Sequence, residues 1–295
     1  MLKNKFKFSV EDLEKIANSV RQDLIKMLVE AGSGHTAGPL GLADVFTALY
    51  FRVLNHNPKK PTWDKRDRLC LSCGHVVPVR YATMARAGYF PLSELKTLRK
   101  INSRLQGHPS YLDIPALEHS SGPLGQGSSV AVGMAISAKM NKQKHYVFCV
   151  VSDGEQQEGQ TWEAAMLAGK HKLDNLIFIM DRNNIQIDGT TEEIMPLNPL
   201  KEKYEAFGWH VLEIDGNNMK EVVDACELAK TVHEKPVMIL AYTIPGKGVS
   251  FFENDYRWHG SPPGTLETEF TPPKAEQEKD ALNELKKGRK QIFVQ

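Results

Sequence analysis

The sequence feature that most constrains the fold is a pair of short, uninterrupted apolar runs, each of which ends abruptly in a polar turn. Residues 146–151 form the first run, and a Ser-Asp-Gly turn follows it from Ser152. Residues 176–180 form the second run, and Asp181 ends it. A strand that is apolar at every position is buried on both faces, which is typical of a parallel sheet covered by helices.

Helical stretches alternate with these strands. Ser9 and Asp12 are typical of a helix start, because both side chains can reach free backbone N–H groups. Helices are predicted over 10–31, 42–53, 128–140 and 161–171, loops over 57–62 and 255–273, and two further strands over 211–214 and 237–242. The alternation predicts an α/β fold, a parallel sheet covered by helices on both faces. We expect a main domain over residues 1–274 and a charged C-terminal helix or tail over 275–295.

The charge balance excludes several classes of partner. Lys plus Arg total 37 and Asp plus Glu total 36, so the formal net charge is +1. This balance creates no overall field that would attract nucleic acid or an anionic membrane. No apolar run approaches the ~20 residues that a bilayer span requires, and the first nine residues lack the apolar core of a signal peptide. We expect a cytoplasmic protein that binds neither nucleic acid nor membrane.

Cysteines offer one possible chemistry. Cys70 and Cys73 form a C-x-x-C pair, which occurs in redox and zinc sites. A structural zinc site usually shows a second ligand pair, and none is evident. Plain reduced thiols are the favoured interpretation.

Oxygen-bearing side chains follow both apolar runs. Asp153 comes directly after the first run, and Asn183 lies just beyond the second. Ligands of parallel sheets bind beyond the carboxyl ends of the strands, and oxygen ligands of this kind suit Mg²⁺, which fills its coordination sphere with phosphate oxygens and water. Gly154 lets the backbone pass close to a phosphate. Each turn alone is more often structural, but together they predict a metal–diphosphate site.

Histidines form a second pattern. Four of the ten lie beside glycine: His35, His75, His108 and His259. A lone histidine is usually a surface or satisfied core residue, whereas four on glycine-flanked loops indicate imidazoles that tight turns present to a site. The other six lack this context and are interpreted as structural.

A glycine-rich segment opens the predicted helix over 128–140. Gly122, Gly125 and Gly127 have the spacing G-x-x-G-x-G, and no strand directly precedes them. A nicotinamide-dinucleotide site is therefore a poor fit. A backbone that packs tightly around a cofactor ring remains open.

Taken together, these motifs resemble the amino-terminal, diphosphate-binding half of transketolase. The resemblance runs from about residue 23 to 260 in family order. It comprises Ser33-Gly34-His35, Arg66-Asp67-Arg68, Ser72-Cys73-Gly74-His75, Leu105-Gln106-Gly107-His108-Pro109, the segments 121–127, 153–159 and 183–189, and His259. It implies the thiamine-diphosphate-binding fold of that family, with thiamine diphosphate and Mg²⁺ as cofactors, and residues 1–274 as the binding domain.

The resemblance also implies residue roles. Asp153, Asn183 and the main-chain carbonyl of Ile185 would hold Mg²⁺. Gly154 and His75 would contact the diphosphate. Leu124 and Ile187 would press against the thiazolium ring, and Gly122 and Glu158 are counted with the cofactor-binding residues. His35, His108 and His259 would bind sugar hydroxyls and move protons at the carbonyl as catalytic residues. Glu158 and Glu163 would lie at the subunit contact.

A second half of the active site is expected on another chain. In this family a glutamate of a further domain activates the cofactor. After Asn184 only about 110 residues remain, and most of them finish the sheet, whereas a further α/β domain needs on the order of 100–150 residues. We therefore expect the partner to be a carboxy-terminal transketolase subunit, in a two-plus-two heterotetramer that acts on sugar phosphates.

Other functions stay open at this point. Deoxyxylulose-phosphate synthase and the α subunit of a 2-oxo-acid dehydrogenase share the cofactor, but the segments around His35 and His108 favour transketolase. A non-catalytic relative with the same fold is a further alternative, which retention of Asp153 and Asn183 disfavours.

Overall fold

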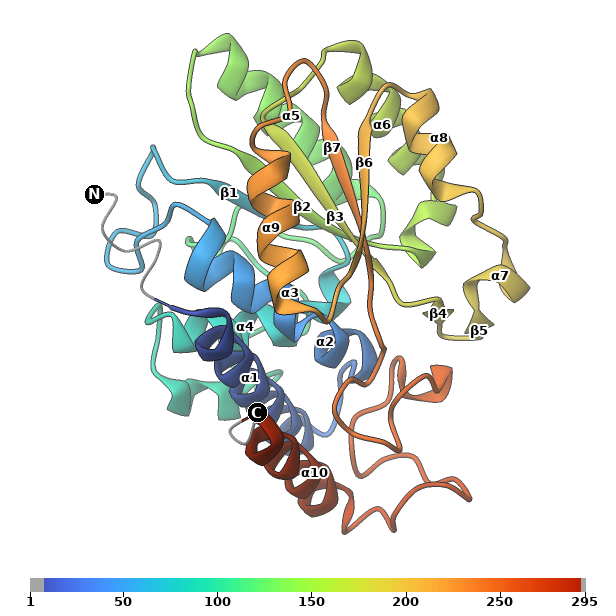
Figure 1. Ribbon diagram of the computed structural model, residues 1–295. Coiled ribbons are helices and arrows are strands. Elements are labelled where there is room, and N and C mark those ends of the chain that lie inside the picture. Colours follow the sequence, from blue (N-terminus) through green and yellow to red (C-terminus); the bar gives the residue numbers. More distant parts are fainter. Residues whose placement is uncertain (1–7, 293–295) are drawn as a thin grey trace.

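The computed structural model describes residues 8–292, which form a parallel sheet between two layers of helices (Figure 1). The helices are α1 Val10–Ala31, α2 Ala37–Gly41, α3 Ala43–Ala48, α4 Val77–Arg86, α5 Gln126–Met140, α6 Gly159–Lys170, α7 Thr191–Ile194, α8 Leu200–Ala206, α9 Met219–Ala229 and α10 Gln277–Ile292. The strands are β1 Arg68–Leu71, β2 Val147–Ser152, β3 Leu176–Arg182, β4 Ile185–Gln186, β5 Gly189–Thr190, β6 His210–Asp215 and β7 Val237–Tyr242.

The main sheet has the strand order β1-β2-β3-β7-β6, and every neighbouring pair is parallel. All carboxyl ends of its strands therefore lie at one edge. The two-residue strands β4 and β5 form a separate antiparallel hairpin directly after β3. This order puts the ends of β1, β2 and β3 side by side.

Each face of the sheet has its own core, because successive side chains of a strand point to opposite faces. In β2, Phe148 and Val150 pack with α1, α3, α4 and α9, whereas Cys149 and Val151 pack with α5, α6 and α8. Figure 1 shows α9 on one side of the strands and α5 and α6 on the other. The predicted fold class, a parallel sheet covered on both faces, is confirmed.

Most of the predicted elements are present with small shifts of their ends. Helix α1 begins where it was predicted, with Ser9 and Asp12 in a reciprocal capping box. The predicted helix over 42–53 is α3 followed by a π-helical turn over Leu49–Val53. Strand β6 differs from the expectation of strands buried on both faces: only Val211 is fully buried and Glu213 and Asp215 are exposed, because the strand forms the edge of the sheet.

Several elements lack a strong sequence pattern. Strand β1 has only four residues, and α4 begins with valines and a proline. Neither was predicted, nor were α2, α8, α9 and the β4–β5 hairpin. Their positions follow from tertiary packing rather than from local periodicity.

The C-terminal helix α10 packs against α1 (Figure 1). Asn18 of α1 donates a hydrogen bond to the main-chain oxygen of Leu285, and Ala281 and Leu285 are buried in the same core as α1. The predicted loop over 255–273 is irregular apart from a single turn at Tyr256–Trp258. Among residues 8–292, no helix is both long and apolar enough to cross a bilayer.

Candidate functional site

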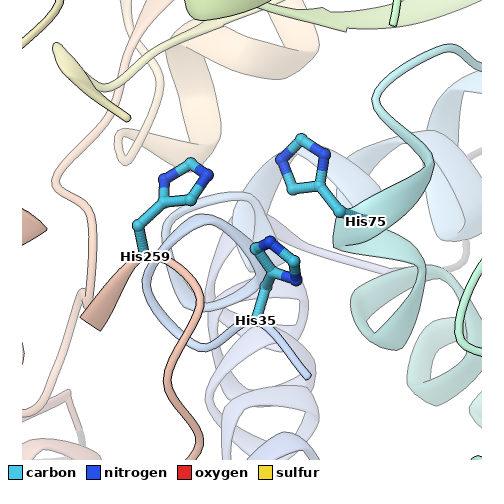
Figure 2. A group of neighbouring side chains, drawn as sticks. All are labelled: His35, His75 and His259. Carbon is cyan, nitrogen blue, oxygen red and sulfur yellow. The ribbon is translucent and has the colours of Figure 1, made fainter. Parts of the chain in front are cut away.

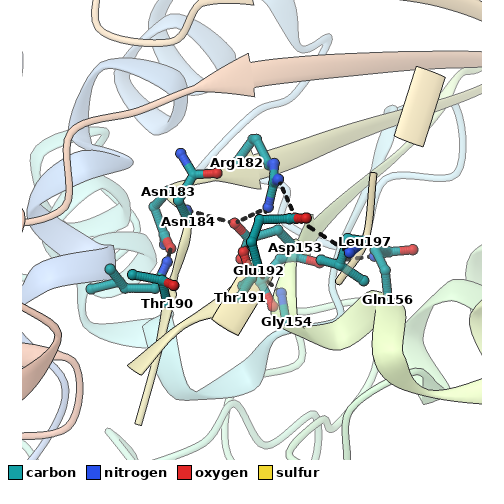
Figure 3. Close-up of polar contacts among 12 residues, drawn as sticks. Asp153, Gly154, Gln156, Arg182, Asn183, Asn184, Thr190, Thr191, Glu192 and Leu197 are labelled. Carbon is teal, nitrogen blue, oxygen red and sulfur yellow. Dashed lines mark hydrogen bonds and ion pairs between the residues drawn. The ribbon is translucent and has the colours of Figure 1, made fainter. Parts of the chain in front are cut away.

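The ends of β2 and β3 bring the predicted oxygen ligands together. Ser152 is paired with Asp181 in the parallel register, and the Asp153 N–H donates to the Asp181 carbonyl at 3.2 Å. The Asp153 Oδ2 atom accepts a hydrogen bond of 2.7 Å from the N–H of Asn184 (Figure 3). Asp153 is therefore joined directly to the turn that carries Asn183, as the metal-site prediction requires.

Two hydrogen bonds fix the direction of the Asn183 amide. Its Nδ2 donates to Asp181 Oδ2 at 2.7 Å, and its Oδ1 accepts from the Ile185 N–H at 3.0 Å. Because an ionised carboxylate only accepts hydrogen bonds, the NH₂ group of the Asn183 amide must face Asp181. The amide oxygen, Oδ1, is therefore the atom that can face a cation. Thr243 donates to the other oxygen of Asp181. Asp181 was not predicted as a site residue, although it stands at the end of an apolar run.

The β4–β5 hairpin lies over this edge of the sheet. Ile185, whose carbonyl is the third expected oxygen ligand, is buried at the start of the hairpin. Ile187 lies between the two strands of the hairpin and is 65% exposed. An isoleucine that is open on the surface of a single chain is available for contact with a flat apolar ring.

Glu155 joins three backbone segments beneath the site. It is fully buried; its Oε1 accepts from the Gly125 N–H at 2.6 Å and from Ser72 Oγ, and its Oε2 accepts from the Ser152 N–H at 3.2 Å. The glycine-rich loop, the end of β1 and the end of β2 are thereby tied together. No role was predicted for Glu155, because nothing in the Asp-Gly-Glu turn shows which of its side chains points inward.

The glycine-rich loop approaches the end of β1 closely. A Cβ atom on Gly127 would lie 2.5 Å from the Cα of Ser72, so only glycine fits. Gly125 has a φ of +81°, a backbone conformation that favours glycine. The loop is thus shaped by backbone contact, which agrees with the close packing considered from the sequence.

Three of the four glycine-flanked histidines lie together in one cluster (Figure 2). The ring centroids of His35 and His75 are 4.6 Å apart, and His259 lies 5.4 Å from each. The three come from the loop after α1, the turn after β1 and the irregular segment after β7. Segments more than 180 residues apart in the chain therefore supply one cluster, since His75 and His259 are separated by 184 positions.

Burial keeps these imidazoles neutral. It lowers the pKa of His35 to about 3, helped by the nearby His259 and Arg99, and lowers the pKa of His259 to about 4. Burial and the neighbouring histidines hold the pKa of His75 well below its ordinary value. A neutral imidazole can both donate and accept a hydrogen bond, which is what proton transfer at a carbonyl requires.

The cluster also has the spacing of a metal site, with three ligand nitrogens within 4.8 Å of one another. A histidine that binds a metal almost always donates its other N–H to a carboxylate, a carbonyl or water. The Nδ1 atoms of His35 and His259 are buried and have no hydrogen-bond partner among the described residues. The geometry therefore favours a hydroxyl-rich ligand over a bound metal at these rings.

His108 lies at the margin of the cluster. It is exposed, and its ring carbons lie within 3.6 Å of where a Cβ on Gly122 would be. A proton on His108 would disfavour protonation of His35 and His75. Burial and Arg99 lower the pKa of His108 as well. The structure brings this fourth predicted histidine to the glycine-rich loop rather than into the central group.

The remaining predicted residues lie close by but more openly. Leu124 is half-buried against the core on the side of the sheet covered by α1, α3, α4 and α9. Glu158 is exposed, and its Cβ lies about 3.2 Å from the position that a Cβ on Gly125 would take. Glu163 is exposed on α6. Exposed Met166 and Leu167 follow it on the same helix. Neither glutamate contacts the histidine cluster in the single chain.

The cysteine pair lies in the interior of the chain. All four cysteines are free and buried. Burial raises the pKa of Cys70 and of Cys73, so neither is a thiolate at neutral pH. Free, buried thiols agree with the favoured interpretation of this pair as plain reduced cysteines.

Burial also raises the carboxyl pKa values at the strand ends. The pKa of Asp153 rises to about 6, although Arg182 and two backbone N–H groups favour the carboxylate. The pKa of Asp181 rises to about 7, with the Asp153 charge adding to the effect. A divalent cation would reverse both tendencies, because it favours the ionised carboxylates.

Comparison with known proteins identifies the family. Residues 13–279 match the family described as "Transketolase, thiamine diphosphate binding domain". The chain is 46% identical over 248 residues to the 6-deoxy-6-sulfo-D-fructose transketolase subunit SqwG of a Clostridium species, covering 84% of this chain and 90% of that protein. It is 39% identical over 284 residues to a subunit of the apulose-4-phosphate transketolase of Actinobacillus succinogenes, covering 96% and 99%.

Solved structures give the same result. The transketolase of Campylobacter jejuni superposes with a TM-score of 0.81 at 34% sequence identity, over 95% of this chain and 48% of that one. This chain therefore spans about half the length of the solved transketolase, and nearly the whole length of the relatives that are named as subunits.

Proposed function

The chain belongs to the transketolase family, as its thiamine-diphosphate-binding part, and we propose that it works as the N-terminal subunit of a split enzyme. The fold is the thiamine-diphosphate-binding α/β fold, and the activity of the family is the transfer of ketol groups. We propose that a two-carbon ketol unit is moved from a ketose phosphate to an aldose phosphate. The observation that carries this is the junction of Asp153 with the Asn183 turn at neighbouring strand ends.

The residues at the strand ends fit Mg²⁺ and a diphosphate. The donor set is a carboxylate on Asp153, an amide oxygen on Asn183 whose direction Asp181 fixes, and the Ile185 carbonyl. These are hard oxygen ligands, and three of them leave room for the phosphate oxygens and water that Mg²⁺ retains. We propose that these three hold the metal and that Gly154 and His75 contact the diphosphate.

The chemistry of the group explains why the rest of the site is needed. Splitting a ketose beside its carbonyl leaves a carbanion, for which thiamine diphosphate supplies the electron sink when bound. The chain supplies position and dryness. We propose that Leu124 and the exposed Ile187 lie against the ring, and that Gly122 and Glu158 complete the cofactor pocket.

We propose that His35, His108 and His259 handle the sugar. Their low pKa values keep the rings uncharged at neutral pH, so each can hold a hydroxyl or pass a proton at the substrate carbonyl. The unpartnered buried Nδ1 atoms of His35 and His259 support this role, because buried polar atoms ordinarily have partners. Sugar hydroxyls would supply them.

A second polypeptide completes the proposal. The relatives that match over nearly their whole length are named as subunits, and this chain covers 48% of the solved transketolase. The family resemblance implies that the activating glutamate lies in the part of a transketolase that this chain does not match. A hollow of about 490 Å³ lined by Trp162, Met195, Leu197 and Phe207 gives the chain an apolar surface suited to such a partner. We propose a two-plus-two heterotetramer, with Glu158 and Glu163 at the contact between the two copies of this chain.

We further propose a division into a binding domain over residues 1–274 and a C-terminal segment over 275–295. The cytoplasm is our proposal for its location, which the free and buried state of all four cysteines supports.

The test is reconstitution. The chain is co-expressed with a carboxy-terminal transketolase subunit encoded beside it, and ketol transfer is measured with xylulose 5-phosphate and ribose 5-phosphate. Apulose 4-phosphate and 6-deoxy-6-sulfofructose are tested as donors, because the named relatives act on them, and pyruvate tests the alternative thiamine reactions. We expect activity from the pair and none from either chain alone.

A matched pair of variants gives the control. Asp153→Ala should abolish metal-dependent cofactor binding and activity, whereas Asp224→Ala, an exposed aspartate on α9, should retain both. Turnover of pyruvate alone, or cofactor binding without ketol transfer from any donor, would contradict the proposal.

A further inference from the structure

Arg182, the last residue of β3, is a buried cation that contacts the proposed metal ligand. The residue is only 3% exposed. Its Nη1 donates to Asp153 Oδ2 at 3.2 Å and to Thr191 Oγ1 at 2.8 Å, and its Nη2 donates to Glu192 Oε1 at 2.8 Å (Figure 3). Asp153 is 1% exposed, so solvent does not compete for this contact.

The anchor of the guanidinium is itself held in place. Glu192 Oε1 also accepts from the Leu197 N–H at 3.2 Å, and Thr191 is fully buried in α7. A planar guanidinium with two fixed acceptors on one side has little freedom to turn. The position of the guanidinium beside Asp153 is therefore fixed by its contacts with Thr191 and Glu192 and does not depend on the Asp153 carboxylate.

The hydrogen bonds of Asp153 leave its two oxygens unequal. Oδ2 accepts from Arg182 and from the Asn184 N–H, which uses both of its lone pairs. Within residues 8–292, Oδ1 accepts only from the Gly154 N–H, at 2.7 Å. One lone pair of Oδ1 is thus the position on this carboxylate that remains for a cation.

This inequality bears on which ion the site prefers. Ca²⁺ takes six to eight oxygens at roughly 2.3–2.6 Å and binds a carboxylate through one oxygen or through both, whereas Mg²⁺ requires a near-ideal octahedron at roughly 2.0–2.1 Å, whose angles the two oxygens of one carboxylate do not fit. A carboxylate with one oxygen already saturated can bind only through the other. This removes the two-oxygen binding mode that is open to Ca²⁺ and so favours the smaller ion.

We propose that Arg182 is a positioning residue that saturates Asp153 Oδ2, confines metal binding to Oδ1 and so makes the site select Mg²⁺ over Ca²⁺. The inference rests on the proposed function, in which Asp153 is a metal ligand. It assigns to Arg182 no contact with cofactor or substrate. Its consequence is a change in ion preference, which a loss of general stability would not produce.

The test uses the complex of this chain with its carboxy-terminal partner and reads cofactor binding rather than activity. Thiamine diphosphate is held at a fixed concentration, Mg²⁺ or Ca²⁺ is titrated, and quenching of tryptophan fluorescence reports binding. Trp258 is buried beside His259 and serves as the probe. In Arg182→Met we expect the preference for Mg²⁺ over Ca²⁺ to fall by about tenfold, the lower end of the effect that loss of an outer-shell partner has on metal affinity.

Two further variants separate geometry from charge. Arg182→Lys keeps the charge, but one ammonium group cannot span Asp153, Thr191 and Glu192, so its ion preference should resemble that of Arg182→Met. Arg104→Met removes an exposed arginine that pairs with Glu94, and its preference should equal the wild-type value.

An unchanged ion preference in Arg182→Met and Arg182→Lys would overturn the inference. Should neither variant fold, Glu192→Gln decides, because it weakens the anchor at a side chain that is 38% exposed; the same direction of change supports the inference and no change overturns it. Absence of metal-dependent binding in the wild-type complex would contradict the proposed function itself, and the inference with it.

Discussion

Two buried carboxylates at the strand ends differ in their partners, and this difference predicts opposite responses to the same chemical change. Glu155 accepts hydrogen bonds from two backbone N–H groups, one on each oxygen, at Gly125 and Ser152. Asp181 accepts from the Asn183 amide on one oxygen and from the Thr243 hydroxyl on the other. Both residues are buried.

Replacement by the corresponding amide places an NH₂ group where one oxygen was. In Glu155→Gln either orientation directs this group at a backbone N–H that cannot reverse its direction. One hydrogen bond to a charged group is lost, about 1.5–3 kcal/mol, and a buried donor is left without an acceptor, about 1–3 kcal/mol. Burial raises the pKa of Glu155, which means that the buried carboxylate is itself unfavourable, and its replacement by a neutral amide offsets part of this loss. We expect a net loss of stability of about 3 kcal/mol.

In Asp181→Asn the NH₂ group can face Thr243, because a hydroxyl is able to accept as well as donate. The oxygen then still accepts from Asn183, and the amide of Asn183 keeps its direction. Burial raises the pKa of Asp181 to about 7, so the buried carboxylate is unfavourable. Its replacement by a neutral amide favours the variant further. We expect a change in stability of less than about 1 kcal/mol.

Thermal unfolding followed by circular dichroism measures both variants. For a chain of 295 residues, a loss of about 3 kcal/mol lowers the Tm by about 5 °C, whereas Asp181→Asn should shift it by under about 2 °C. Equal shifts for the two variants, or a larger one for Asp181→Asn, would refute the reasoning from donor direction.

Three other properties should follow from the same structure. Because burial lowers the pKa values of His35 and His259 to about 3 and 4, these two side chains bind more protons in the unfolded chain than in the folded one below about pH 6.5. Their contribution to stability should therefore fall as the pH drops from about 6.5 towards 4, and a double glutamine variant followed by urea unfolding should lose less stability over this range than the wild-type chain. The four buried thiols should be unreactive towards a thiol reagent until the chain unfolds, and rapid labelling of the native protein would be the contrary result. Gly127→Ala should strongly destabilise the chain, because its Cβ would lie 2.5 Å from a main-chain atom of Ser72. Gly133→Ala on the same helix meets nothing within 4 Å and should stabilise the chain by about 0.5–1 kcal/mol. Similar Tm values for the two variants would contradict the packing argument.

The sequence predicted the architecture wherever a pattern was local. The apolar runs that became β2 and β3 are buried at every position, and the capping residues Ser9 and Asp12 mark the start of α1. Both signals depend on neighbouring residues alone. Strand β1 and helix α4 were missed, because a four-residue strand and a helix that opens with valines and proline carry no such signal.

The site was predictable as a set of residues but not as a network. Strand order places Asp153 beside the Asn183 turn, so their proximity follows from the expectation of a parallel sheet. The roles of Arg182 and Glu155 depend on which way their side chains point from a turn, and that direction is set by long-range packing against α7 and the glycine-rich loop. The resemblance to a family supplied the histidine roles, which spacing alone left open.

We propose that Asp153 and Asn183 together hold one divalent ion and, through it, the diphosphate of the cofactor. A crystal structure of the complex grown with Mn²⁺ and thiamine diphosphate tests it most directly, because Mn²⁺ gives an anomalous signal and prefers the same oxygen ligands. We expect one peak at roughly 2.0–2.2 Å from Asp153 Oδ1 and from Asn183 Oδ1. A peak among the rings of His35, His75 and His259, or none near Asp153, would contradict the account.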